Sequence, residues 1–289
     1  MHQPPLKPTA HHNDLLQLNK GQLVQAVSDG LGLIADNALA LWREANEIAR
    51  LGNRRAVGIL QALAEDEAGK ALLLLDAIRC PDNRRDERDS LLRHFNQHLA
   101  KSIYAYYYNT RPADMREVIT IVDSQRQEFY REGEYGEYIA RNSLIESRES
   151  RLYVSYVREE DGTHYWSVPY PPDLLWGDVV PSGAIRVVEA LYILQLLAYP
   201  RLTLIADFWN GINYVIEDPD PTAPLRNPDF RECNSNMLRA VEENGFPLEE
   251  EQRPNMKVVL NNLLFPLYPF DLSPDKNFDQ LPPADELDV

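Results

Sequence analysis

The chain has 289 residues, of which 44% are hydrophobic and 26% are charged, as in an ordinary soluble globular protein. Its apolar runs are too short or too interrupted to cross a membrane, and the first twenty residues lack the apolar core of a secretion signal. The two cysteines are too few for a disulfide framework, and no CxxC pair is present to hold zinc. We therefore expect a cytoplasmic protein with no membrane partner.

The net charge of −16 is spread unevenly along the chain. Residues 1–155 hold 20 basic and 22 acidic side chains, whereas the remainder holds 9 basic and 23 acidic ones. Because phosphate neutralisation dominates non-specific affinity for nucleic acids, an acidic surface repels a long polyanion. We expect no binding of duplex DNA, and any chemistry on RNA is expected in the N-terminal half.

Residues 20–150 have the apolar periodicity of helices, and helices of this length favour an antiparallel bundle. The pair Gly52-Asn53 predicts a stop between the first two helices. The expected helices cover residues 21–50, 54–78 and 86–108, the segment after Pro112 as far as Phe129, and residues 135–147.

The pattern changes after residue 150. Residues 151–170 alternate between polar and apolar side chains around the turn dipeptide Asp161-Gly162, which predicts a β-hairpin. Residues 171–275 are expected to form an accessory region of helices and loops that packs on the bundle, with helices over 183–199 and 201–215. This region is rich in proline and acidic residues, and we expect residues 276–289 to be a disordered tail. The fold class is therefore mainly α.

Two residues of the second helix stand out. Glu67 occupies the only charged position in an apolar helical stripe, where an unpaired carboxylate is costly. It forms either a structural ion pair with Lys70 or a partner for a catalytic group across a cleft. Gly69 lies in the middle of the same helix, which indicates a close approach by another helix.

The third predicted helix carries the clearest candidate for catalysis. His94, His98 and Lys101 are spaced i, i+4 and i+7 and so share one face, and Arg93 precedes them. Imidazole and cationic groups together suit acid–base work on a phosphodiester. The alternative is a solvated polar face without chemistry, and Arg88 with His94 is a second candidate pair.

Other kinds of site have less support. His94 and His98 could bind a metal together with Glu67, but residue 95 is phenylalanine where a zinc protease has its general base. The chain has no glycine-rich phosphate loop and no GxSxG motif, so we expect no cofactor and no metal. Four tyrosines at 104 and 106–108 either stack on RNA bases or belong to the core.

Several short motifs follow one another along the chain: Ala38 to Leu41 on the first predicted helix, Ala64-Glu-Asp-Glu-Ala-Gly-Lys-Ala71 on the second, the His98-x-x-Lys101 element, and Arg151-Leu-Tyr-Val-Ser-Tyr ahead of Asp161-Gly162 and Val168-Pro169. Together they resemble the AbiV-type abortive-infection family of HEPN domains. The resemblance covers about residues 30–170, and residues 171–289 show none. It implies an antiparallel helical bundle that forms homodimers and acts as a metal-independent endoribonuclease.

The resemblance also implies roles for individual residues. Arg93-His94-x3-His98 matches the family's signature of arginine, a polar residue and a later histidine. His98 would be the general base, Arg93 would stabilise the phosphorane, and His94 would orient the site or supply the acid. Glu67, Lys70 and Lys101 would support them. Residues five apart on an ideal helix point about 140° away from each other, so Arg93 and His98 need a distorted helix or a dimer partner to converge.

Two functional hypotheses follow. The first is an anti-phage effector that cleaves RNA as a dimer, triggered by a phage-encoded protein. The second is a non-catalytic interaction protein that arrests growth by binding a protein partner. Only the first requires His98 and Arg93 to be accessible in one shared cleft, with Glu67 or Lys101 nearby.

Overall fold

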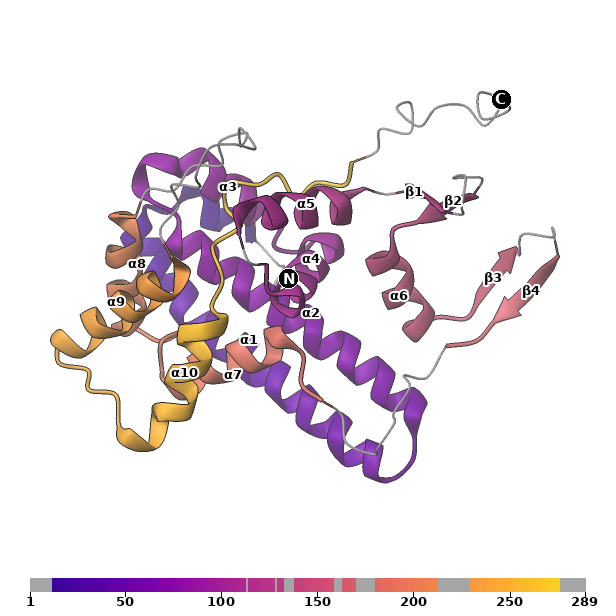
Figure 1. Cartoon of the computed structure of the whole chain (residues 1–289), viewed down its shortest axis with the longest axis horizontal. Coiled ribbons are helices and arrows are strands. Elements are labelled where there is room, and N and C mark those ends of the chain that lie inside the picture. Colours follow the sequence, from indigo (N-terminus) through magenta and orange to yellow (C-terminus); the bar gives the residue numbers. More distant parts are fainter. Residues whose placement is uncertain are drawn as a thin grey trace, which may run out of the picture.

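The computed structural model describes residues 12–112, 114–127, 129–132, 138–158, 163–169, 180–212 and 229–275, and this part of the chain is mainly α-helical (Figure 1). Short 3-10 helices cover His12–Gln17, Asp82–Arg84 and Glu250–Gln252. The Asp161-Gly162 turn and the tail expected at 276–289 lie outside the described residues.

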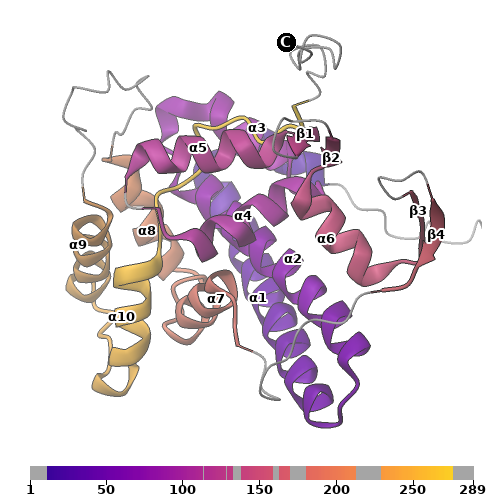
Figure 2. The ribbon, with the colours of Figure 1, turned by 45° about the vertical axis from the view of Figure 1, so that its right-hand side comes forward.

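Two long helices, α1 (Lys20–Arg50) and α2 (Arg54–Arg79), form a helical hairpin that runs through the molecule (Figure 2). Asn19 begins α1 with a capping box, and the Asn53 side chain accepts a hydrogen bond from the backbone of α2. Gly52 between them has a φ of +78°, which favours glycine. The predicted helices and the stop between them are confirmed.

The predicted helix over 86–108 is wrong as a single element, because the chain breaks it into α3 (Arg85–Arg93) and α4 (His98–Thr110). The break is closed locally, since His94 Nδ1 lies 2.8 Å from Gln97 Oε1. Gln97 has extended backbone angles and precedes the first turn of α4. The apolar period continues across the break, which explains why the sequence pattern does not reveal it.

The helix expected at 135–147 is also wrong. After α5 (Met115–Arg126), the strands β1 (Phe129–Glu132) and β2 (Tyr138–Arg141) pair antiparallel, and α6 (Ser143–Leu152) follows. Asn142 sets this boundary with both ends of its side chain. Its Oδ1 accepts hydrogen bonds from the first turn of α6, and its Nδ2 donates to two carbonyls at the end of α5.

The β-hairpin predicted within residues 151–170 is confirmed by its two strands. Strands β3 (Ser155–Arg158) and β4 (His164–Ser167) pair antiparallel, with Tyr156 opposite Trp166. Both aromatic side chains are exposed, and the hairpin projects away from the helices in both views (Figures 1 and 2). It follows α6 directly in the chain.

Four further helices complete the described fold: α7 (Gly183–Ile193), α8 (Arg201–Asn210), α9 (Phe230–Glu243) and α10 (Arg253–Asn262). The first two are shorter than the sequence pattern predicts. Figures 1 and 2 show α9 and α10 on the side of the α1–α2 hairpin away from α6. The described part of the acidic region therefore does not lie over α6.

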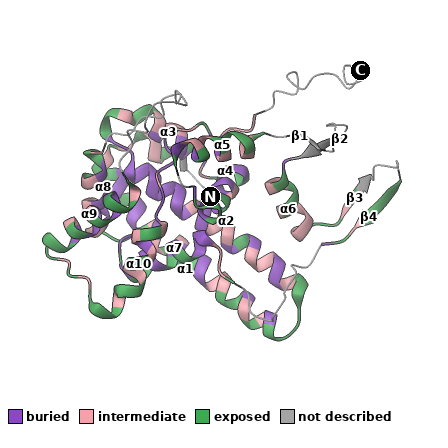
Figure 3. Cartoon of the chain, viewed as in Figure 1, coloured by how far each residue is buried: buried purple, intermediate pink, exposed green. Residues whose placement is uncertain are grey.

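One hydrophobic core joins the N-terminal helices to α7–α10 (Figure 3). At its centre Asp76 binds Arg79 at 2.9 Å, the Tyr104 hydroxyl at 2.9 Å and the Leu267 N–H at 2.7 Å, while Arg79 donates to the Leu264 carbonyl. Burial raises the pKa of Asp76 to about 6, against the opposing effect of Arg79. Within the described residues, no helix combines the length and apolar character needed to cross a membrane.

Candidate functional site

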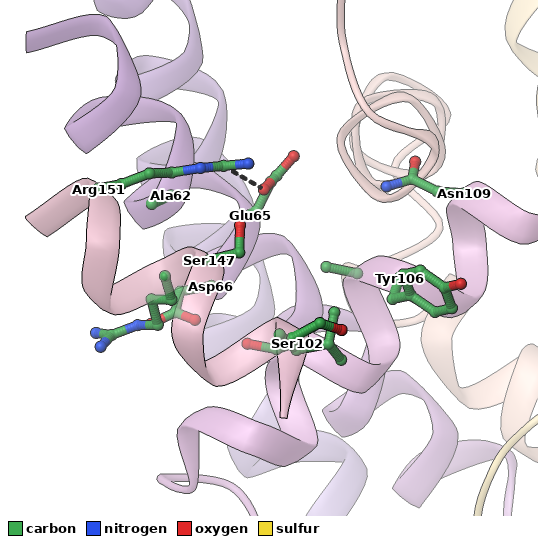
Figure 4. A pocket seen from close by; sticks show the side chains of 12 residues that line it. Ala62, Glu65, Asp66, Ser102, Tyr106, Asn109, Ser147 and Arg151 are labelled. Carbon is green, nitrogen blue, oxygen red and sulfur yellow. Dashed lines mark hydrogen bonds and ion pairs between the residues drawn. The ribbon is translucent and has the colours of Figure 1, made fainter. Parts of the chain in front are cut away.

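A cavity of about 360 Å³ lies between α2, α4 and α6 (Figure 4). Helical spacing of three or four residues brings side chains of each helix to the same side. The lining residues are Ala62, Glu65 and Asp66 of α2, Ser102, Ala105, Tyr106 and Asn109 of α4, and Ser143, Leu144, Ser147, Arg148 and Arg151 of α6.

Helices α2 and α4 approach closely at one point beside this cavity. A Cβ on Gly69 would lie 2.2 Å from the carbonyl oxygen of Lys101. The mid-helix glycine therefore removes a side chain where two backbones meet, as the sequence predicts. The close approach brings Asp66, one turn before Gly69, next to the first turn of α4.

Asp66 is the central residue of the site. Its Oδ2 lies 2.9 Å from His98 Nδ1, 3.4 Å from Lys101 Nζ and 3.3 Å from Arg148 Nε. The carboxylate is almost completely buried, as is Lys101. A buried carboxylate requires paired charges and hydrogen bonds, and here α4 and α6 supply them. It also lies at the N-terminal end of α4, where the helix dipole favours negative charge.

His98 is the accessible member of this group. It is the first residue of α4, and 56% of its side chain is exposed. In the neutral ring, Nδ1 carries the proton that it donates to Asp66, so Nε2 is the free acceptor. This is the arrangement in which a carboxylate orients an imidazole for general-base catalysis.

The site carries surplus positive charge although the chain is acidic. Lys101, Arg148 and Arg151 face the two carboxylates Asp66 and Glu65. Arg151 Nη1 lies 3.7 Å from Glu65 Oε2, an ion pair too long for a hydrogen bond (Figure 4). Burial raises the pKa of Glu65, against the opposing effect of Arg151. An anion is therefore the natural ligand here.

The structure does not bring the predicted pair Arg93 and His98 together within the chain. Arg93 ends α3 and is exposed, and none of the described side chains pairs with it. His94 is buried, bonded to Gln97 and 3.9 Å from Asp271. Arg88, of the second predicted pair, is buried and binds Asp89 instead.

The sequence predicts that Glu67 forms either a structural ion pair with Lys70 or a partner for a catalytic group, and in the structure it forms the ion pair. Its carboxylate lies 3.3 Å from Lys70 Nζ, and Lys70 also lies over the ring of Phe95. Lys101, in contrast, belongs to the site, because its Nζ donates a hydrogen bond to Asp66. Of the four tyrosines on α4, those at 104, 107 and 108 are buried in the core, and Tyr106 alone reaches the cavity.

The three proposed metal ligands do not converge. His98 contacts Asp66, His94 lies near Asp271, and Glu67 forms an ion pair with Lys70. Among the residues that the structure describes, no group of three or more His, Cys, Asp or Glu side chains is placed to hold a metal ion.

Sequence reasoning missed Asp66, Arg148, Arg151 and Asn109. The run Glu65-Asp66-Glu67 carries a signal, because three consecutive carboxylates on a helix point in three directions and one must face a neighbour. Glu67 lies in the apolar stripe of α2, whereas Asp66 is the carboxylate that contacts His98 and Lys101 of α4. Arg148 and Arg151 are one helical turn apart, and the wrong boundary of α6 hides this spacing.

Comparisons of the chain with protein-family models, with curated proteins and with solved structures give no match. The geometry of the Asp66 site and the short motifs described above are therefore the basis for a functional proposal.

Proposed function

We propose that the chain is a metal-independent endoribonuclease in which His98 is the general base. The observation that carries the proposal is the 2.9 Å contact between His98 Nδ1 and Asp66 Oδ2, with the imidazole half exposed beside a cavity of surplus positive charge. An oriented imidazole and an arginine at one carboxylate suit transfer at a phosphodiester.

In this mechanism His98 Nε2 takes the proton of a ribose 2′-hydroxyl. The 2′-oxygen then bonds to phosphorus, the bond to the 5′-oxygen breaks, and the 5′-oxygen takes a proton from water. Arg148 contacts Asp66 through Nε, and no described residue binds its terminal nitrogens, which would stabilise the charge that develops on the phosphoryl oxygens. The products are a 2′,3′-cyclic phosphate and a 5′-hydroxyl end.

The proposal includes a HEPN-type homodimer that acts in anti-phage defence. It rests here on the resemblance of the motifs at 64–71, 98–101 and 151–162. Arg93 is exposed at the end of α3, so a second copy of the chain could bring it to His98. A phage-encoded protein would be the trigger.

The test is incubation of the purified chain with total RNA, with and without EDTA. Wild type should cleave in EDTA, and His98→Ala should lose at least about 100-fold of the rate. Arg148→Ala should lose a comparable fraction, whereas Arg186→Ala, an exposed arginine on α7, should be unchanged. Arg93→Ala decides whether a second copy contributes. Cleavage that needs a metal, or that persists in His98→Ala, would contradict the mechanism.

A specific observation favours the second candidate, a non-catalytic interaction protein. The β3–β4 hairpin exposes Tyr156, Tyr165 and Trp166, and the Tyr156 and Trp166 rings lie 5.0 Å apart. Exposed aromatic side chains on a projecting element are typical of protein-binding surfaces. If wild type does not cleave RNA and Trp166→Ser abolishes growth arrest in cells, this function replaces the first.

A further inference from the structure

We propose that the cavity between α2, α4 and α6 binds one mononucleotide unit, with its phosphate at Arg151 and its base between Tyr106 and Asn109. The inference deepens the proposed ribonuclease and rests on it for the link to RNA. The cavity shares Asp66 with the His98 site, so the bound unit would lie next to the cleaved phosphodiester.

The size and lining of the cavity fit such a unit. Its volume of about 360 Å³ lies at the lower end of sites for small organic ligands. The lining combines two arginines, two carboxylates that pair with cationic side chains, several hydroxyl groups, an amide and one aromatic ring. A phosphate binds to cationic donors such as arginine, and the hydroxyl groups suit a ribose. A base stacks on a flat ring and binds a hydrogen-bond donor at its edge, which here is the amide.

Arg151 is the phosphate-binding group. It extends from α6 toward Glu65 (Figure 4). Its Nη1 lies 3.7 Å from Glu65 Oε2, which is too far for a hydrogen bond. No described residue accepts a hydrogen bond from its guanidinium, so its donors are free for an anion. Ser147, one turn before it on α6, adds a hydroxyl at the same cavity.

Asn109 is the base-reading group. Its Oδ1 accepts a 2.6 Å hydrogen bond from the N–H of Gly183, at the start of α7. Because a backbone N–H can only donate, this contact fixes which end of the amide is oxygen. The Nδ2 donors are directed toward the side of the cavity where Glu65 and Arg151 lie (Figure 4). Tyr106, one turn earlier, offers its ring beside them.

Asn109→Asp is a sharp test, because it keeps the acceptor for Gly183 and replaces only the cavity donor. Asn37→Asp, on the exposed face of α1, adds the same charge elsewhere and is the matched control. The full-length protein is titrated calorimetrically with the four nucleoside 5′-monophosphates, with inorganic phosphate and with a 2′-O-methyl hexanucleotide. None of these ligands can be cleaved by attack of a 2′-hydroxyl.

A mononucleotide or the hexanucleotide should bind wild type and Asn37→Asp alike, and Asn109→Asp and Arg151→Ala should each weaken binding about tenfold or more. Binding of the hexanucleotide alone assigns the site to an RNA chain, and binding of both assigns it to free nucleotides as well. Absence of binding, equal binding of inorganic phosphate, or binding that both variants leave unchanged would overturn the inference.

The cleavage assay separates this inference from the proposed function. Nucleotide binding that Asn109→Asp weakens, without RNA cleavage by wild type, retains the cavity and removes the ribonuclease. RNA cleavage with unaltered rate and base preference in Asn109→Asp and Arg151→Ala retains the ribonuclease and removes the nucleotide cavity.

Discussion

Gly69 of α2 and Lys101 of α4 touch through their backbones, and a single added Cβ on Gly69 would lie 2.2 Å from the Lys101 carbonyl oxygen. Two residues of the site depend on this contact. Lys101 itself binds Asp66, and His98 lies one turn before it. The spacing of the two helices therefore sets the geometry of the Asp66 site.

Gly69→Ala should destabilise the protein by about 2–3 kcal/mol, because the two backbones must move apart. It should also lower RNA cleavage, since α4 carries His98. Gly30→Ala is the control: its Cβ would meet nothing within 4 Å in the middle of α1, so it should stabilise by up to about 1 kcal/mol. Urea unfolding of both variants checks the pair, and equal stabilities would contradict the close contact.

Asp66→Asn and His98→Ala should separate stability from activity. Asp66→Asn leaves the buried Lys101 without a charge partner and should cost about 1–3 kcal/mol of unfolding free energy. His98→Ala removes a half-exposed side chain and should change stability by less than about 0.5 kcal/mol. His98→Ala should reduce cleavage by at least about 100-fold, as expected for loss of a general base, and Asp66→Asn by about 10-fold or more, because the imidazole loses its orienting carboxylate. A stable Asp66→Asn with full activity would refute the role of Asp66.

The sequence predicts the parts of this fold that depend on local pattern. The hairpin of α1 and α2, the Gly52-Asn53 stop and the β3–β4 pairing all follow from periodicity and turn residues. The break before His98 does not, because the apolar period runs through it and the closing contact is between two side chains, His94 and Gln97. The site itself depends on α6, whose position is set by contacts between distant segments.

Asn142 provides a test of how α6 is positioned. Its Nδ2 donates at 2.7 Å to each of the carbonyls of Gln125 and Gln127, while its Oδ1 begins α6. Asn142→Asp keeps the acceptor that caps α6 but places a carboxylate oxygen next to the two carbonyl oxygens. It should lower the free energy of unfolding by about 2–3 kcal/mol. It should also weaken cleavage, since Arg148 and Arg151 move with α6. Asn19→Asp, a cap at the exposed start of α1, should be nearly neutral in the same urea titration.

The buried Asp76 predicts a pH dependence of stability. Burial raises its pKa from 3.8 to about 6, so the folded state holds a proton over a range where the unfolded state has lost it. Its contribution to stability is therefore greatest below pH 4 and falls as the pH rises toward 6. Relative to Asp76→Asn, wild type should lose on the order of 3 kcal/mol between pH 4 and pH 7. Guanidinium unfolding across this range checks the slope, with Asp36→Asn as an exposed control.

The contacts of Asp76 and Arg79 also bear on how the protein is made. Arg79 binds a carbonyl 185 positions later in the chain, and Asp76 binds an N–H 191 positions later. When only the first helices have been synthesised, Asp76 and Arg79 are present, but the backbone groups of Leu264 and Leu267 that bind them have not yet been made. The hydrogen bonds of Asp76 and Arg79 can be completed only after Leu267 has left the ribosomal exit tunnel, so this part of the core closes late in synthesis.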